Sequence, residues 1–213
     1  MDWGLVAFDF DGTLSDSEMT VLLGEQQGVA EEMAAITERA MADEIEYATS
    51  LRRRAALLEG LSIEAADRAF DAVELRPGTA EVLSTIQNAG LRTAILTGGF
   101  DRGVERALSR AETSVDRIIA NRLPVEDDAL TGDVEGPLIE GTKDDALAEL
   151  AMEWDIDPGA TIAVGDGAND LPMLETAGLA IGFRPKSPVE PACDVVVESM
   201  AELASVLERK EVV

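Results

Sequence analysis

Two aspartates stand two residues apart near the start of the chain, in the stretch LVAFDFDGTLSDSE (residues 5–18). Asp9 lies within an apolar run, Leu5–Phe10, that predicts a buried strand, and Asp11 follows this run directly. Because side chains alternate between the faces of a strand, we expect both carboxylates to point the same way. Paired carboxylates can act as a nucleophile and a general acid–base, or can bind a hard metal ion.

A second acidic cluster follows another apolar run, in AVGDGANDLPM (residues 163–173). Asp166, Asn169 and Asp170 lie in a glycine-rich turn that is expected to open a helix. A carboxylate at this strand end, facing the first pair, would complete a Mg²⁺ site made of oxygen ligands. Helix capping by the same side chains is the alternative. Another Asp-x-Asp, at residues 155–157, has no apolar run before it and precedes a Pro-Gly pair, which indicates a solvated turn.

Two further segments have the chemistry to contact a phosphate. Thr97 and Gly98, in AILTGGF, end an apolar strand with a hydroxyl and backbone N–H groups near a helix N-terminus. A Gly-Gly turn is a weak signal by itself. Lys143 stands at the predicted start of a helix, where lysine is electrostatically disfavoured, so a nearby phosphate would explain it better than a surface position. The chain has only two other lysines, Lys186 and Lys210.

The composition narrows the chemistry further. The 213-residue chain has no histidine and one cysteine, Cys193, which excludes Ser–His and Cys–His catalysis, histidine-ligated metals and an internal disulfide. Its 43 acidic and 17 basic residues give a net charge of −26, which should repel nucleic acid and anionic membranes. Acid excess with scarce lysine favours adaptation to high salt over an ordinary acidic protein. Neither a signal peptide nor a membrane span is apparent, so a cytoplasmic location is expected.

Hydrophobic periodicity predicts the elements that must position these residues. After Pro77, strands alternate with helices, which predicts an α/β fold: a Rossmann-like, mostly parallel sheet with helices on both faces. Residues from about 15 to 75 instead carry apolar residues at helical spacing, with breaks near Gly28 and Gly60. Three or four helices are expected there. The predicted organisation is therefore a core of residues 1–14 and 76–213 with a helical insert of residues 15–75.

Together these segments resemble the haloacid dehalogenase-like phosphatases. The four motifs of that family match, in order and over nearly the whole chain, Asp9-Phe-Asp11-Gly-Thr13, Thr97, Lys143 and Gly165-Asp166-Gly-Ala-Asn169-Asp170. Within this superfamily, the chain looks most like the phosphoserine phosphatase family, through ILTGGF, ANRLPVEDDALTGDVEGPLI and VGDGANDLPML. It departs from that family at three positions: Gly12 and Thr97 stand where serine is common, and Tyr47 where phenylalanine is common.

The resemblance implies a two-step hydrolysis of phosphoserine, the last step of serine biosynthesis. Asp9 would attack phosphorus, and Asp11 would protonate the departing alkoxide and then activate water. Mg²⁺ would be bound by Asp9, the main-chain carbonyl of Asp11, and Asp166, with Asp170 steadying these ligands. The implied phosphate-binding residues are Thr97, Gly98, Lys143 and Asn169.

The resemblance extends to the insert, which corresponds to a cap domain that closes over the site. Glu18 stands where the family's glutamate binds the substrate ammonium, and Met41, Tyr47 and Arg54 fall at the spacing of its cap residues. Arg54 would hold the substrate carboxylate as a bidentate pair. From composition alone, the run of residues 52–54 is equally a solvated helix face or a set of internal ion pairs.

Three alternatives stay open at this point. The chain could act on another small phosphate ester, or could pass the phosphoryl group to an acceptor alcohol such as homoserine. It could also be an inactive binding or scaffold protein on the same fold, although all four motifs keep their reactive side chains. A small phosphate ester is the expected partner, neither nucleic acid nor a membrane is expected to be one, and the chain is expected to be a monomer or homodimer.

Overall fold

The computed structural model describes residues 3–41 and 44–213, apart from the side chain of Met41. A parallel six-stranded sheet has the order β3-β2-β1-β6-β7-β8, and β4 and β5 form a separate antiparallel hairpin. The strands are β1 (Leu5–Phe8), β2 (Arg92–Phe100), β3 (Arg117–Asn121), β4 (Val125–Glu126), β5 (Ala129–Leu130), β6 (Thr161–Gly165), β7 (Leu179–Phe183) and β8 (Val195–Val197). The helices are α1 (Met19–Gln27), α2 (Ala30–Met41), α3 (Tyr47–Ala56), α4 (Ile63–Asp71), α5 (Thr79–Asn88), α6 (Asp101–Arg110), α7 (Lys143–Glu153), α8 (Leu171–Thr176) and α9 (Met200–Arg209).

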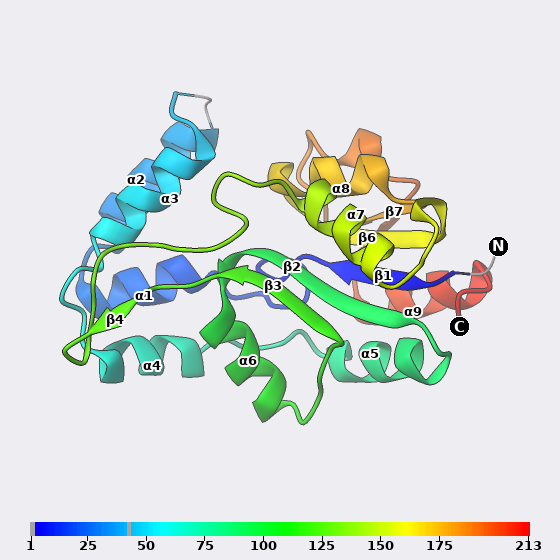
Figure 1. Cartoon of the computed structure of the whole chain (residues 1–213), viewed down its shortest axis with the longest axis horizontal. Helices are drawn as coiled ribbons and strands as arrows, with labels where there is room; N and C mark the ends of the chain where they lie inside the picture. The colour runs from blue at the N-terminus through cyan, green and yellow to red at the C-terminus, as the bar shows by residue number, and fades with distance from the viewer. Residues whose placement is uncertain (1–2, 42–43) are drawn as a thin grey trace.

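Helices cover both faces of the sheet. In Figure 1, α7 and α8 lie on one side of it, and α5, α6 and α9 lie on the other. The central strand β1 is apolar at every position because both of its faces are buried, with Val6 and Phe8 in one core and Leu5 and Ala7 in the other. The parallel α/β fold expected from the alternation of strands and helices is therefore confirmed.

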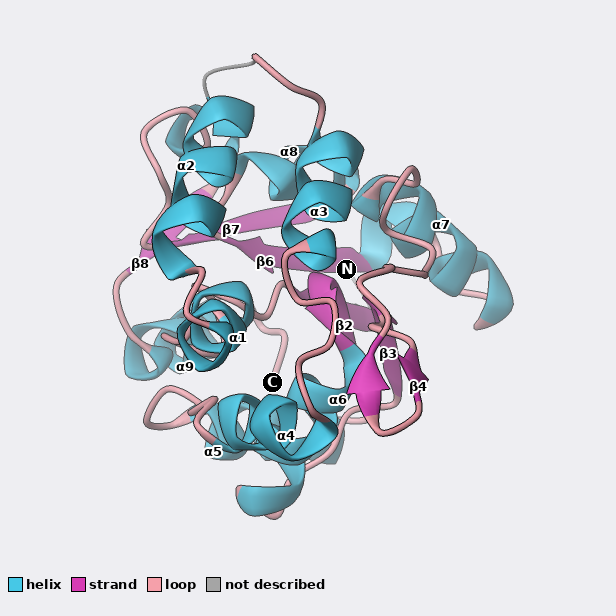
Figure 2. Ribbon diagram, turned by 90° about the vertical axis from the view of Figure 1, so that its left-hand side faces the viewer, coloured by secondary structure: helices cyan, strands magenta, loops and turns pink. Residues whose placement is uncertain are grey.

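Helices α1–α4 stand between β1 and α5 in the chain, as the helical periodicity of residues 15–75 predicted. The predicted breaks are present: Gly28 ends α1 with a φ of 76°, and Ser62 caps α4 by accepting a hydrogen bond from the Ala65 N–H at 3.3 Å. In Figure 1, α2 and α3 project away from the sheet, at the opposite end from the two chain termini. Figure 2 turns this end of the molecule toward the viewer. No described helix combines the length and hydropathy needed to cross a bilayer.

Ion pairs between α4 and α6 hold one side of the insert against the core. Arg102 lies 2.8 Å from Asp67, and Arg106 lies 2.8 Å from Asp67 and 2.6 Å from Asp71. The partners repeat every four residues on both helices, so they lie along facing sides. Each pair is partly exposed and contributes little by itself, but the set aligns the two helices.

The strand that leads to the first aspartates is shorter than expected. It ends at Phe8, so Asp9 and Asp11 follow the strand, and strand alternation does not orient them. The chain instead turns back on itself, because the N–H groups of Thr13 and Ser15 both donate to the carbonyl of Phe10, at 3.2 Å and 2.9 Å. This turn, at the carboxyl end of β1, places Asp11 next to Gly99 of β2.

The strand that carries Thr97 is longer than expected. β2 continues to Phe100, so Thr97 and Gly98 lie inside it and do not follow it. The pairing with β3 is irregular there, because the register shifts between Leu96 and Phe100. The residues expected to bind phosphate therefore lie in a bulge, a distortion that commonly redirects side chains next to functional sites.

Candidate active site

Lys143 bridges two buried carboxylates that come from different parts of the chain. Its Nζ donates to Asp9 Oδ1 and to Asp170 Oδ1, at 2.5 Å each. The three residues are 3%, 4% and 0% exposed, respectively. Burial lowers the pKa of Lys143, but the charges of Asp170 and Asp9 outweigh this effect and raise it overall. The two carboxylates thus explain how a lysine ammonium is kept, charged and buried, in the first turn of α7.

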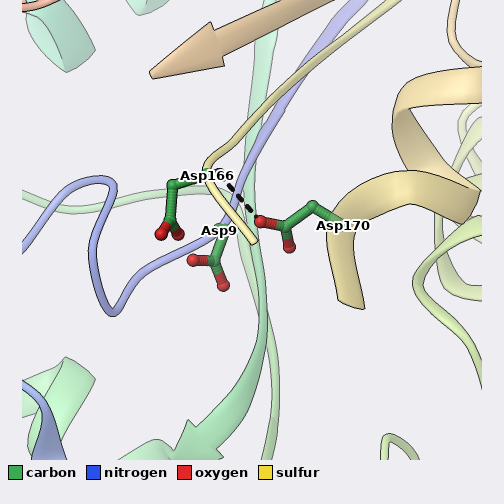
Figure 3. Close-up of side chains that lie close together, drawn as sticks. All are labelled: Asp9, Asp166 and Asp170. Atoms are coloured by element: carbon green, nitrogen blue, oxygen red, sulfur yellow. Dashed lines mark hydrogen bonds between the residues drawn. The ribbon is translucent and has the colours of Figure 1, made fainter. Parts of the chain in front are cut away.

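Three carboxylates gather around this bridge. Asp9, Asp166 and Asp170 bring carboxylate oxygens within 4.8 Å of one another. Figure 3 shows these three side chains close together. Asp170 Oδ2 accepts hydrogen bonds from the backbone N–H groups of Asp166 and Gly167, at 2.9 Å and 2.8 Å. Asp170 therefore shapes the turn after β6, as well as holding Lys143. An all-oxygen donor set of this kind suits a hard divalent ion such as Mg²⁺.

The two N-terminal aspartates have different surroundings. Burial and the charge of Asp170 raise the pKa of Asp9 to about 7, although Lys143 acts to lower it. Burial raises the pKa of Asp11 well above its ordinary value, and the charges of Glu18 and Asp9 add to this. Asp11 Oδ1 is buried without a hydrogen-bond partner among the described residues. The nearby cationic side chains thus do not balance the negative charge of these carboxylates. A divalent cation bound here would balance it.

Gly12 and Lys186 contact Asp166 and set its position. Gly12 has a φ of 89°, and a Cβ added there would lie 2.8 Å from the Asp166 carboxylate, so both the backbone conformation and the available space favour glycine. The Nζ of Lys186 lies 3.1 Å from Asp166 Oδ2, and its backbone N–H donates to the Asp166 carbonyl at 2.9 Å. The sequence interpretation did not assign Lys186. The available signal was that it is one of three lysines in the chain.

We expect Gly12→Ala to lower turnover by about tenfold or more, because the added methyl group displaces Asp166. Gly90→Ala is the matched control, since Gly90 has a similar φ of 86° and open space around its Cα. Both variants should lose about 1–2 kcal/mol of stability through left-handed backbone strain. Thermal unfolding and phosphatase rates separate the two effects. Equal rates for the two variants would show that Gly12 does not act through Asp166.

The bulge in β2 places a hydroxyl beside the acidic cluster. The Gly99 N–H donates to Thr97 Oγ1 at 2.9 Å, and a Cβ added to Gly99 would lie 2.8 Å from Asp11 Oδ2. The Thr97 hydroxyl donates to no partner among the described residues, so its proton can be donated to a ligand. A cavity of about 370 Å³ opens here, and its lining includes four residues expected to bind substrate: Tyr47, Gly98, Lys143 and Asn169.

The insert reaches this cavity through the first turn of α3. Tyr47 is 40% exposed, and its hydroxyl lies directly against Gly98, so close that any side chain on Gly98 would collide with it. A phenylalanine at position 47 would place no hydroxyl group against Gly98 of β2. The side chain of Met41, another expected substrate contact, lies outside the described residues.

Glu18 and Arg54 bring opposite charges within electrostatic reach of Asp11. Burial lowers the pKa of Arg54, while Tyr47, Glu18 and Asp11 counteract part of that effect. Arg54 Nη1 lies 3.5 Å from the hydroxyl of Thr20, and its Nε is buried without a partner among the described residues. Partial burial raises the pKa of Glu18, although the nearby cations act to lower it. A buried guanidinium N–H with no partner and a neighbouring carboxylate suit a ligand that carries both charges.

Known proteins resemble this chain in sequence. A family model described as haloacid dehalogenase-like hydrolase matches residues 6–175. A phosphoserine phosphatase from Halobacterium salinarum is 50% identical over 204 residues, which cover 96% of this chain and 97% of that protein. One from Methanocaldococcus jannaschii is 37% identical over 195 residues, covering 91% of this chain and 92% of the relative. The high-salt interpretation of the composition is consistent with the first of these sources.

Solved structures agree with the sequence relatives. A phospho-aspartyl intermediate analogue of phosphoserine phosphatase superposes with a TM-score of 0.88 at 35% identity, covering 97% of this chain and 99% of that one. A substrate-bound phosphoserine phosphatase complex also gives a TM-score of 0.88, at 34% identity, covering 98% of this chain and 99% of its own. The chain therefore belongs to the haloacid dehalogenase-like hydrolases, within their phosphoserine phosphatase family.

Proposed function

We propose that this protein is a Mg²⁺-dependent phosphoserine phosphatase, which hydrolyses O-phospho-L-serine to L-serine and phosphate. The main support is the unlike surroundings of the two aspartates: Asp9 is held by the Lys143 ammonium, whereas Asp11 Oδ1 is buried without a partner among the described residues. Two carboxylates that differ in this way can divide the roles of nucleophile and general acid. The names of the relatives point to the same substrate.

In the first step, Asp9 attacks phosphorus while the bond between phosphorus and the seryl oxygen breaks. The carboxylic acid of Asp11 gives its proton to the departing oxygen, so serine leaves as the alcohol. In the second step, the ionised Asp11 takes a proton from water, and the resulting hydroxide attacks phosphorus. Phosphate leaves, the carboxylate of Asp9 is regenerated, and Asp11 holds its proton again.

Neighbouring residues supply the electrostatic part of this proposal. Asp9, the main-chain carbonyl of Asp11, and Asp166 would hold Mg²⁺, with Asp170 keeping the turn and Lys143 in place. When bound, Mg²⁺ would neutralise phosphoryl charge and favour the ionised form of Asp9. Donors directed at the phosphoryl oxygens lower the barrier because their positions are set before the reaction. The proposed donors are Thr97, the Gly98 N–H, Lys143 and Asn169.

The insert would recognise the rest of the substrate. Glu18 would bind the ammonium group and Arg54 the carboxylate, while Met41 and Tyr47 contact the serine moiety. Residues 15–75 then act as a cap that closes over the core of residues 1–14 and 76–213 and excludes bulk water. The enzyme would work in the cytoplasm as a monomer or homodimer, with a small phosphate ester rather than nucleic acid or a membrane as its partner.

We expect Arg54→Ala to lower kcat/KM for phosphoserine by about 100-fold, because the substrate carboxylate loses a charged hydrogen-bond partner. The loss on p-nitrophenyl phosphate, which has no such carboxylate, should be about threefold or less. Arg53→Ala is the matched control, since the neighbouring Arg53 side chain is exposed. Equal losses on both esters would contradict carboxylate recognition by Arg54.

A substrate panel tests the proposed function directly. Phosphate release from phosphoserine and other small phosphate esters should be measured with Mg²⁺ and with EDTA, at low and at high salt. We expect phosphoserine to be the best substrate, with Mg²⁺-dependent turnover in the absence of any acceptor alcohol. A requirement for homoserine or another acceptor would indicate a phosphotransferase, and preference for a different ester would contradict the assigned substrate. Absence of turnover on every ester would indicate a binding protein.

A further inference from the structure

Asn121, the last residue of β3, is a fully buried polar side chain that bonds in two directions. Its Nδ2 donates to the carbonyl of Gly98 at 3.1 Å. Its Oδ1 accepts a hydrogen bond from the backbone N–H of Leu138, also at 3.1 Å. The mechanism proposed above uses Gly98 but gives no role to Asn121.

The first of these bonds lies where the pairing of β2 with β3 is interrupted. The pairing of β2 with β3 goes from Leu96–Ile119 directly to Phe100–Asn121, so three residues of β2 face one residue of β3. The regular ladder of backbone hydrogen bonds cannot continue through such a bulge. The half-buried carbonyl of Gly98 therefore needs a donor from elsewhere, and the side-chain amide of Asn121 supplies one.

The peptide group between Gly98 and Gly99 is thereby held at both ends. Its carbonyl accepts from Asn121, and its N–H donates to Thr97 Oγ1 at 2.9 Å. Glycine peptides rotate easily unless they are hydrogen-bonded on both sides. The two bonds therefore set the direction of the Thr97 hydroxyl and of the Gly98 backbone, which lines the cavity.

The second bond reaches another residue that lines the same cavity. Leu138 belongs to the segment that leads into Lys143, and both residues line the cavity together with Gly98. Gly136 packs on the backbone of Asn121 so closely that a Cβ added to Gly136 would lie 2.6 Å from the Asn121 Cα. Asn121 thus connects the strand that carries the phosphate donors to the segment that carries the catalytic lysine.

We propose that Asn121 is a positioning residue for phosphoryl binding, which keeps the Thr97–Gly98 donors and the approach to Lys143 at their working separation. This inference rests on the proposed function, because it assigns those donors to the phosphoryl group. Asparagine suits the place because its amide donates to one carbonyl and accepts from one N–H. An aspartate could keep the bond to Leu138, but as a carboxylate it has no donor for Gly98.

The test compares Asn121→Ala and Asn121→Asp with Thr93→Val. Thr93 is a matched control because it too is fully buried on β2, where it donates to Asp116 at 2.9 Å, but at the opposite end of the strand from the bulge. The measured quantities are the Kd of inorganic phosphate by calorimetry with Mg²⁺ present, the Tm, and kcat on phosphoserine and p-nitrophenyl phosphate.

Both Asn121 variants should bind inorganic phosphate about tenfold or more weakly, with similar losses of kcat on the two esters, because the phosphoryl group is common to all three ligands. Thr93→Val should lower the Tm without changing the Kd. Asn121 variants that lose Tm but bind phosphate as the wild type does would show that its role is only structural. If Asn121→Ala does not fold, the Kd of inorganic phosphate for Asn121→Asp tests the proposal. Phosphate binding requires no turnover, so a wild-type protein that binds phosphate but does not hydrolyse phosphoserine would contradict the proposed function alone.

Discussion

Replacing Asp9 with asparagine is expected to lower the turnover of phosphoserine by about 10⁴-fold or more, because a neutral amide is a poor nucleophile toward phosphorus. The fold should persist. Asparagine has the shape of aspartate, and its carbonyl can accept the hydrogen bond that Lys143 now gives to Asp9 at 2.5 Å. The substitution also removes a carboxylate whose pKa is raised to about 7, first by burial and then by the charge of Asp170.

Asp157→Asn is the matched control for this prediction. Asp157 belongs to the other Asp-x-Asp of the chain, where its carboxylate accepts from the Gly159 N–H at 2.7 Å in an exposed turn. Steady-state phosphate release and mass spectrometry of the quenched enzyme would follow turnover and the phosphorylated aspartate. We expect Asp157→Asn to keep wild-type activity and to form the intermediate. Near-normal turnover by Asp9→Asn would overturn the nucleophile assignment.

Replacing Lys143 with methionine is expected to damage both activity and stability. Turnover should fall by about 10³-fold, because a fixed positive charge beside the phosphoryl group is lost. Asp9 and Asp170 would remain buried without their shared ammonium, and removing one member of a buried ion pair costs about 3–5 kcal/mol. Protonation of one carboxyl group offsets part of this cost, because the loss of Lys143 raises the pKa of Asp9 further.

The stability loss in Lys143→Met should therefore depend on pH. A carboxyl group with a folded-state pKa above the unfolded value of about 3.9 keeps its proton in the folded state, so folding becomes less favourable as pH rises between the two values. We expect a larger loss in the free energy of unfolding at about pH 8 than at about pH 5, measured by urea titration with EDTA. Lys210→Met is the control, since Lys210 is exposed near the C-terminus. The same small loss in both variants at both pH values would contradict a buried bridge.

Local patterns were sufficient to predict the type of fold, and they singled out the candidate site residues. Apolar runs followed by Gly, Pro or Asp predicted the central strands, and the helical spacing of residues 15–75 predicted α1–α4. Asp9, Asp166 and Lys143 were recognised because each stands at the end of a strand or the start of a helix, a place that its neighbours in sequence define. Parallel strands then require those ends to meet at one edge of the sheet.

Several features of the site could not be predicted in this way. The end of β1 at Phe8, the bulge around Gly98 and the contact of Lys186 with Asp166 depend on which segments lie side by side. Asn121 looked like an ordinary strand residue, because its partner Gly98 is 23 positions away in the chain. Nothing in the neighbouring residues of a segment encodes contacts of this kind.

The sequence by itself determined the class of fold, the helical insert and the carboxylate chemistry, because periodicity and motif spacing act over a few residues. Only the tertiary structure decided which donor forms a hydrogen bond to which carboxylate oxygen. Lys143 meets Asp9 across 134 positions of sequence, and that contact acts to lower the pKa of Asp9 and helps to raise the pKa of Lys143. Burial and the approach of distant charges determine these pKa values, and both arise only when the strands pack in register.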